Sequence, residues 1–168
     1  MAGRTEDAGF TSEWVFRHCA ETHRNLSETI RHTSDATNGR FHPHGEFGAI
    51  YVACEEATAL AELDHRAVRT GIERSEMLPR LMLTLHLRLQ RILDLSDEST
   101  RTAWGTDLDE ITREDDYARC HEIARIARRD GYEGIRFPAV GGAGENYAVF
   151  FDQLKPGSEL EIVAEKWI

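Results

Sequence analysis

Residues 81–89, LMLTLHLRL, are the most regular stretch of this 168-residue chain. Leucines occupy every odd position, and Met82, Thr84, His86 and Arg88 lie between them. Successive side chains of a β-strand point to opposite faces, so this alternation predicts a strand with one buried face. Residues 92–95, ILDL, predict another strand directly after it.

Two amphipathic segments on either side of this region predict helices. The first runs from about Glu55 to Thr70 and is followed by Gly71, and the second runs from Glu114 to Asp130 and is followed by Gly131. Both begin with acidic residues and carry arginines near their ends, which complements the helix dipole. A glycine directly after each segment is typical of a helix C-terminus.

Shorter apolar runs predict the remaining strands, at 14–16, 49–53, 134–137, 147–151 and 159–167. Residues 20–48 are polar, contain several glycines and one proline, and predict a long loop, while residues 1–12 resemble a loose tail. The strands outnumber the helices and do not alternate with them. We therefore predict an α+β fold: a single compact domain over residues 1–168, with mixed or antiparallel sheets and a few helices.

The overall charge and the cysteine content narrow the function classes. The chain has 30 acidic and 20 basic residues and a net charge of -10, without a basic cluster, which argues against direct binding of nucleic acid or anionic membranes. It lacks the run of about 18 apolar residues that a membrane-spanning helix needs. Cys19, Cys54 and Cys120 are far apart and form no CxxC motif. Buried free thiols in a reducing cytoplasm are therefore expected.

Several short motifs suggest chemistry but favour structural explanations. Residues 141–144, GGAG, precede a predicted strand and no GK[ST] follows them, so a turn is favoured over a phosphate-binding loop. The backbone amides of such a turn could still form an anion nest. His42 and His44 have no further ligands at suitable spacing, so no metal site is predicted. No GxSxG motif supports a serine hydrolase.

Three residues in the first half of the chain could act together: Arg40 in the predicted loop, Tyr51 on the next strand and Glu62 on the next helix. Taken alone, they are better explained as a surface charge, a half-buried aromatic residue, and a carboxylate paired with Arg66 one helical turn later.

The order and spacing of longer motifs resemble those of the RES domain family. Residues 39–53, GRFHPHGEFGAIYVA, and residues 58–62, TALAE, resemble the turn, strand and helix of that family. Residues 131–138, GYEGIRFP, and 146–150, NYAVF, resemble its last motifs, and Arg17 lies where the family has an early arginine. The resemblance covers about residues 14–151.

This resemblance implies an ADP-ribosyltransferase-like fold and the toxin function of a toxin–antitoxin pair. The implied reaction cleaves the nicotinamide–ribose bond of NAD⁺, which is the substrate, without a metal. ADP-ribose would pass to a protein acceptor or, in a glycohydrolase, to water. Implied partners are a cognate Xre-type antitoxin, a protein target of ADP-ribosylation and a second copy of the chain. The alternative is a catalytically decayed RES domain that only binds its antitoxin.

By the same resemblance, Glu62, Arg40 and Tyr51 are catalytic. The carboxylate would stabilise the cationic ribosyl centre, arginine would hold phosphate, and tyrosine would offer a flat face to the cationic ring. The residues implied to bind the dinucleotide are Arg17, His18, Arg40, Tyr51, Ala139 and Asn146. The chain departs from the family at Ala139, where serine is usual, at His42, where asparagine is common, and at His18, where an aromatic hydroxyl is frequent.

Overall fold

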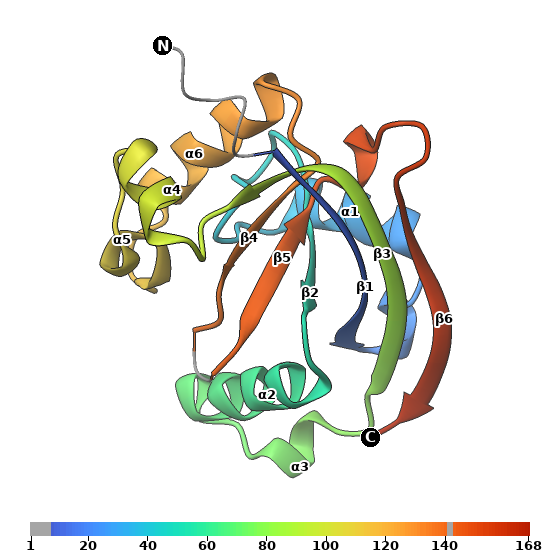
Figure 1. Cartoon of the computed structure of the whole chain (residues 1–168). Helices are drawn as coiled ribbons and strands as arrows, with labels where there is room; N and C mark the ends of the chain where they lie inside the picture. Colours follow the sequence, from blue (N-terminus) through green and yellow to red (C-terminus); the bar gives the residue numbers. More distant parts are fainter. Residues whose placement is uncertain (1–7, 141–142) are drawn as a thin grey trace.

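The computed structural model describes residues 8–140 and 143–168 (Figure 1). Six strands form one strongly curved sheet in the order β1 (Ala8–Cys19), β2 (Ile50–Ala53), β5 (Glu145–Val149), β4 (Gly134–Pro138), β3 (Leu81–Asp94) and β6 (Glu159–Trp167). Because β1 also pairs with β3, the first five strands close into a ring, and β6 adds to the other side of β3. Only β3 and β4 pair in parallel, so the predicted α+β class with a mixed sheet is confirmed.

The alternating stretch lies at the centre of this sheet. Leu81, Leu83, Leu85, Leu87 and Leu89 are all buried, and they pack with Val15, Val52 and Tyr147 in one core cluster. Burial of one leucine side chain contributes about 1.5–3 kcal/mol. The two strands predicted at 81–89 and 92–95 are one continuous strand, because β1 pairs with β3 along its whole length.

Both predicted helices are present. α2 (Glu56–Thr70) ends at Gly71, whose φ of 67° is left-handed, as the sequence predicted. α6 (Ala118–Arg129) begins later than predicted, because Asp116 accepts a hydrogen bond from the Ala118 amide and precedes the first turn. The buried face of α6, which includes Cys120, packs in a second core cluster on the other side of β4 and β5.

Several predicted boundaries were wrong. Residues 20–48 are not one loop, because they contain η1 (Glu21–His23) and α1 (Leu26–Ala36), and residues 8–12 belong to β1 rather than to a loose tail. The strand predicted at 147–151 is β5, at 145–149. The structure adds α3 (Arg74–Met77), α4 (Glu98–Ala103), α5 (Leu108–Thr112) and η2 (Phe151–Gln153).

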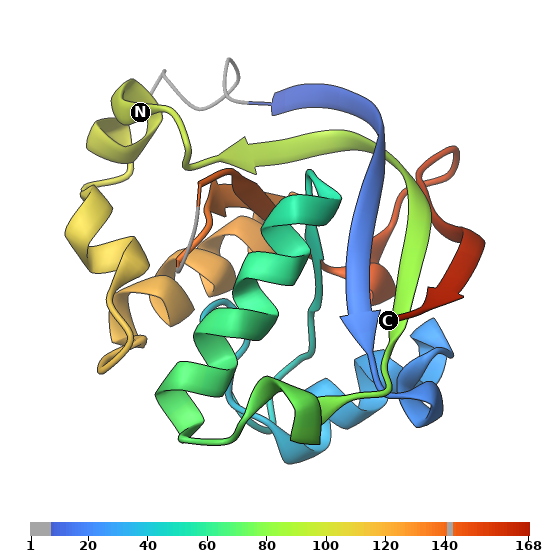
Figure 2. The same ribbon diagram turned by 90° about the horizontal axis from the view of Figure 1, so that it is seen from below.

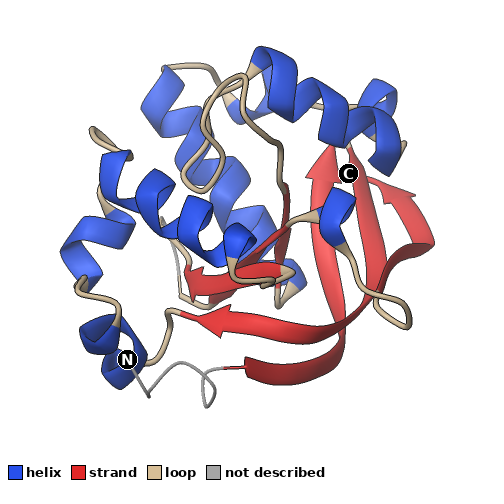
Figure 3. Cartoon of the chain, turned by 90° about the horizontal axis from the view of Figure 1, so that it is seen from above, coloured by secondary structure: helices blue, strands red, loops and turns tan. Residues whose placement is uncertain are grey.

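The helices are distributed unevenly around the sheet. α4, α5 and α6 lie together on one flank, and α2 crosses the opposite end of β4 and β5 (Figure 1). Seen from below, α2 runs beside β1, with which it makes direct contacts (Figure 2). The strands β1, β3 and β6 form an arched wall, and the end of β3 leads toward α4 (Figure 3). No helix in the described ranges has the length and apolar character to cross a membrane.

Candidate active site

A cavity of about 430 Å³ opens between α2, the turn around residue 39 and the segment before α6. It gathers five of the predicted site residues from five separate parts of the chain: His18, Arg40, Tyr51, Glu62 and Asn146. The other lining residues are Asn38, Gly39, His65, Arg66, Arg69, Glu114, Tyr117, Phe137 and Val140. We call it the large cavity.

A second cavity of about 210 Å³ adjoins it, and we call this one the small cavity. The two share four lining residues, His18, Tyr51, Glu62 and Arg66, so they form one continuous cleft. The small cavity is also lined by Phe16, Arg17, Cys19, His23, Ala53, Ala59 and Arg80. Glu62 therefore lies where the two cavities meet.

Glu62 is held by Asn146 rather than by Arg66. Asn146 Nδ2 donates a hydrogen bond to Glu62 Oε1, which brings α2 and β5 together. A carboxylate can only accept hydrogen bonds, so the amide nitrogen must face it. The other amide atom, Asn146 Oδ1, is buried and has no partner among the described residues. This oxygen is available to accept a hydrogen bond from a ligand in the large cavity.

The environment of Glu62 raises the pKa of its carboxyl above the ordinary value. Burial raises the pKa of this carboxyl, whereas the Asn146 hydrogen bond and the nearby His65 lower it. A carboxylate partly removed from water interacts more strongly with a cation beside it. The site therefore combines a desolvated carboxylate with one fixed donor that keeps it oriented.

Asn146→Ala should change the pH dependence of any reaction that uses ionised Glu62. Without the amide donor the pKa of Glu62 rises further, so the acidic limb of the rate–pH profile should move to higher pH. The measurement is a profile of reaction rate against pH for the parent and the variant. A limb that stays in place, or that moves to lower pH, would contradict this role of Asn146.

Two hydrogen bonds hold the Tyr51 side chain in place in the cavity wall. Its hydroxyl oxygen accepts a hydrogen bond from the Phe41 amide at 2.9 Å and lies 2.8 Å from Nδ1 of His42. Burial raises the pKa of Tyr51, so its hydroxyl stays neutral. Burial also lowers the pKa of His42 to about 4, so the imidazole stays neutral as well. His42 thus holds the tyrosine that lines both cavities.

The two predicted arginines occupy different parts of the cleft. Arg40 is buried in the wall of the large cavity, where its Nη1 donates to the carbonyls of Ile111 and Arg113 and its guanidinium lies over the ring of Tyr117. Arg17 lines the small cavity, and its Nη1 donates to the Tyr51 carbonyl at 3.1 Å. These backbone carbonyls hold the Arg40 side chain in place, because a buried guanidinium needs acceptors for its N–H groups.

His18 lies beside a further arginine that the sequence did not reveal. Arg80 Nε donates to His18 Nδ1 at 3.0 Å. Burial, followed by the charges of Arg80 and Arg17, lowers the pKa of His18 to about 3. A neutral imidazole that accepts from an arginine orients that arginine toward the small cavity.

Ala139 does not line either cavity, although its neighbour Val140 lines the large one. Its backbone amide donates to the Gly144 carbonyl at 2.9 Å, and Thr58 Oγ1 donates to the Ala143 carbonyl at 3.1 Å. Ala143 is thus tied to α2, and Gly144 is tied to Ala139. Gly141 and Gly142, where an anion nest was considered, lie outside the described residues.

Ala139→Ser should therefore change the reaction rate by less than about tenfold. A gain of one good hydrogen bond to a charged group would change the rate by about tenfold or more. Asn146 and the arginines already supply polar groups to the cleft. The measurement compares the two proteins at one fixed substrate concentration. A larger increase would show that the alanine weakens the site.

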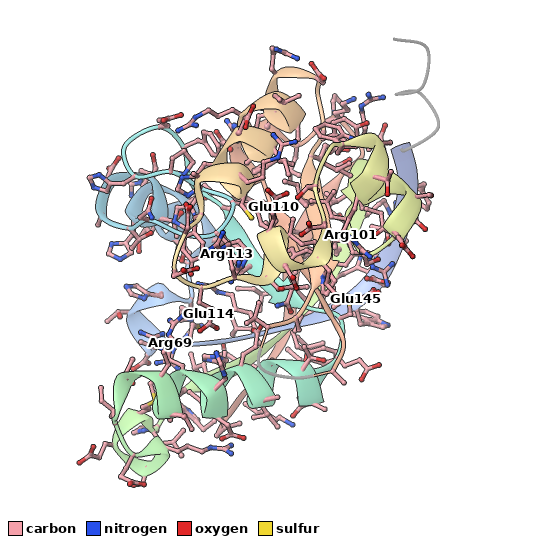
Figure 4. All side chains as sticks on the ribbon, turned by 90° about the vertical axis from the view of Figure 1, so that its left-hand side faces the viewer. Arg69, Arg101, Glu110, Arg113, Glu114 and Glu145 are labelled. Atoms are coloured by element: carbon pink, nitrogen blue, oxygen red, sulfur yellow. The ribbon has the colours of Figure 1, made fainter. Side chains whose placement is uncertain are left out.

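The cleft also contains residues that the sequence analysis did not assign to it. Arg66 and Arg69 follow Glu62 at four and seven residues along α2, and this helical spacing was the signal that could have revealed them. Arg69 on α2 and Glu114 on the segment before α6 both line the large cavity, and the two side chains are labelled in Figure 4. His65 Nε2 lies 2.5 Å from Glu114 Oε1 and links the same two walls.

Apart from Cys19, which lines the small cavity, the remaining candidates line neither cavity. His44 Nε2 is 2.8 Å from the Asp35 carbonyl oxygen. All three cysteines are free thiols, and burial raises the pKa of Cys54 to about 12 and of Cys120 to about 11. Thiols with such pKa values are poor nucleophiles at neutral pH, which agrees with a structural role.

Comparisons with known proteins place the chain in a family. The model of the RES domain family matches residues 15–167. The chain is 35% identical over 127 residues to a Mycobacterium tuberculosis protein named "Probable NAD(+) phosphorylase", covering 73% of this chain and 58% of that protein. It is 27% identical over 121 residues to NAD(+) phosphorylase MbcT of the same species, covering 71% and 64%. The chain thus spans about three fifths of the length of these relatives.

A solved structure shares the fold. The crystal structure of the M. tuberculosis MbcT–MbcA toxin–antitoxin complex contains a chain that matches with a TM-score of 0.79 and 23% identity. The match covers 94% of the present chain and 85% of that chain. The arched sheet with its helices is therefore an architecture already seen in a solved protein.

Proposed function

We propose that this chain, which belongs to the RES domain family, cleaves the nicotinamide–ribose bond of NAD⁺ and passes the ADP-ribosyl group to inorganic phosphate. The observation that carries the proposal is Glu62, a partly buried carboxylate oriented by Asn146 at the junction of two cavities lined by arginines. The phosphorylase names of the relatives favour phosphate as acceptor over water or a protein side chain.

The residues of the cleft suit each part of the reaction. Nicotinamide leaves as a neutral molecule from a pyridinium, so no acid is needed to protonate it. The bond breaks through a cationic ribosyl centre, which a nearby carboxylate stabilises. Glu62 lies where the two cavities meet and can do this, whereas the other carboxylate of the lining, Glu114, pairs with His65. The walls at Tyr117 and Phe137 give planar surfaces for the rings of the dinucleotide.

The acceptor choice also fits the acid–base properties of the cleft. Attack by water is faster when a base removes its proton, and His18, the histidine that lines both cavities, has a pKa of about 3 and is a weak base. The hydrogen phosphate dianion is already a nucleophile and needs no such base. The arginines of the cleft and the weak basicity of His18 therefore favour an anionic acceptor over water.

The test is the release of nicotinamide by the purified chain at increasing phosphate concentration. We expect the rate to rise with phosphate and to saturate. A rate that is the same without phosphate would indicate water or a protein as acceptor, and no release at all would favour the alternative of a decayed domain that only binds a partner.

We further propose that the chain is a toxin restrained by an antitoxin protein. The basis is the family membership and the fold shared with a chain of a toxin–antitoxin complex. An enzyme that removes NAD⁺ harms its own cell unless its cleft is closed. Expression of the chain alone should stop growth, and expression with the product of a neighbouring gene for a small DNA-binding protein should restore growth and yield a complex.

A further inference from the structure

We propose that the small cavity is an anion site that holds the attacking phosphate, with Arg66 and Arg80 as its positioning residues. This inference rests on the proposed function and adds the place of the second substrate. Three arginines line the small cavity, Arg17, Arg66 and Arg80, together with two histidines, while Glu62 is its one acidic lining residue. Such a lining attracts a small anion.

The positive charge of the small cavity is not balanced within the described chain. The chain has an excess of acidic residues, and other arginines are paired, such as Arg74 with Asp64 and Arg128 with Asp152. Within residues 8–140 and 143–168, Arg17, Arg66 and Arg80 form no ion pair with a carboxylate. Burial and then the charge of Arg66 lower the pKa of Arg80, so these two cations lie close enough to repel each other.

Donor groups in the cavity remain available. Arg80 uses Nε to bind His18, and its two Nη groups have no hydrogen bond to the rest of the described chain. The guanidinium of Arg66 is likewise unbonded within the described ranges, and Arg17 Nε is buried without a partner. Guanidinium groups bind phosphate through paired hydrogen bonds, so this set matches one phosphate group well.

The sizes and linings of the two cavities indicate that the small one holds the acceptor phosphate and the large one holds NAD⁺ with its pyrophosphate. The large cavity has aromatic and apolar walls at Tyr117, Phe137 and Val140, which suit an extended dinucleotide with two ring systems. The small cavity has about half that volume and adjoins it at Glu62. In an in-line displacement at the ribosyl carbon, the nucleophile approaches from the side opposite the leaving group. Two cavities that meet at the carboxylate provide those two sides.

The step balances without another reactant. An oxygen of hydrogen phosphate forms a bond to the ribosyl carbon, the carbon–nitrogen bond breaks, and its electron pair neutralises the pyridinium nitrogen. The products are nicotinamide and ADP-ribose phosphorylated at that carbon. The negative charge of Glu62 repels the dianion, and Arg66 and Arg80 offset this repulsion where the two groups meet.

The test compares Arg66→Gln and Arg80→Gln with Arg74→Gln, an exposed arginine that lines neither cavity. For the two cavity variants we expect the KM for phosphate to rise roughly ten- to hundredfold, as for loss of one charged hydrogen bond, with the KM for NAD⁺ little changed. Arg74→Gln should leave both values unchanged. A rise in the KM for NAD⁺ alone would place the pyrophosphate in the small cavity and overturn the proposal.

A binding measurement separates this inference from the proposed reaction. Titration of the full chain with inorganic phosphate, followed by ³¹P NMR without NAD⁺, should show binding that both cavity variants weaken and Arg74→Gln does not. If phosphate binds in this way but no NAD⁺ is cleaved, the anion site stands and the proposed reaction fails. If the folded parent chain binds no phosphate, or the variants bind it as tightly, the anion site is refuted.

Discussion

Glu62→Gln should lower the rate of nicotinamide release by roughly 10²–10³, the effect of removing one preorganised charged group from a transition state. The glutamine keeps the size of the side chain, but it carries no charge to stabilise the ribosyl cation. Its amide can still meet Asn146, because an Asn–Gln pair can hydrogen-bond through oxygen and nitrogen. The variant should therefore fold normally and bind NAD⁺.

The matched control is Asp64→Asn, which removes a carboxylate from an exposed position of the same helix, two residues further along. It should leave the rate close to that of the parent, because Asp64 pairs with Arg74 outside the cleft. A folded Glu62→Gln protein with an unchanged rate would remove Glu62 from the mechanism.

Gly39→Ala should abolish most activity by disturbing the wall that contains Tyr51. A Cβ atom at Gly39 would lie 2.0 Å from Cε1 of His42 and 2.9 Å from the Tyr51 hydroxyl. His42 is buried, so its ring has little room to move away. Overpacking of this kind costs about 1–3 kcal/mol of folding stability. Urea unfolding measures that loss, and nicotinamide release measures the loss of activity.

Gly71→Ala is the comparison that isolates this steric effect. Gly71 has a left-handed φ of 67°, but a Cβ atom there meets nothing within 4 Å. Alanine at this position should cost only the backbone term, about 1–2 kcal/mol, and leave the rate unchanged. Equal activities for the Gly39 and Gly71 variants would show that the turn does not shape the cleft.

The sequence predicted those elements whose pattern is local. The leucines of β3 alternate because one face of the strand is buried, and α2 carries its own stop signal at Gly71. α1 was missed because it buries little: Thr29 is its one buried residue, and its apolar face consists of only Leu26 and Ile30, which are partly buried. The first half of β1 was missed because its partner, the second half of β3, lies far along the chain. A pairing of this kind leaves no local pattern.

The candidate site likewise contains residues that the sequence predicted and residues that it could not predict. Glu62, Tyr51, Arg40 and Arg17 were predicted from their family motifs, and the structure brings Glu62 and Tyr51 together with both arginines in one cleft. Arg80 could not be predicted, because it joins the cleft through the register of β1 and β3, which brings it to His18.

The measurement that tests the central claim most directly is the mass of the product formed from NAD⁺ by the purified chain in phosphate buffer. The account predicts ADP-ribose bearing one additional phosphate, formed in equal amount with nicotinamide and absent when phosphate is replaced by a buffer without oxyanions. Unmodified ADP-ribose as the sole product in both buffers would contradict it.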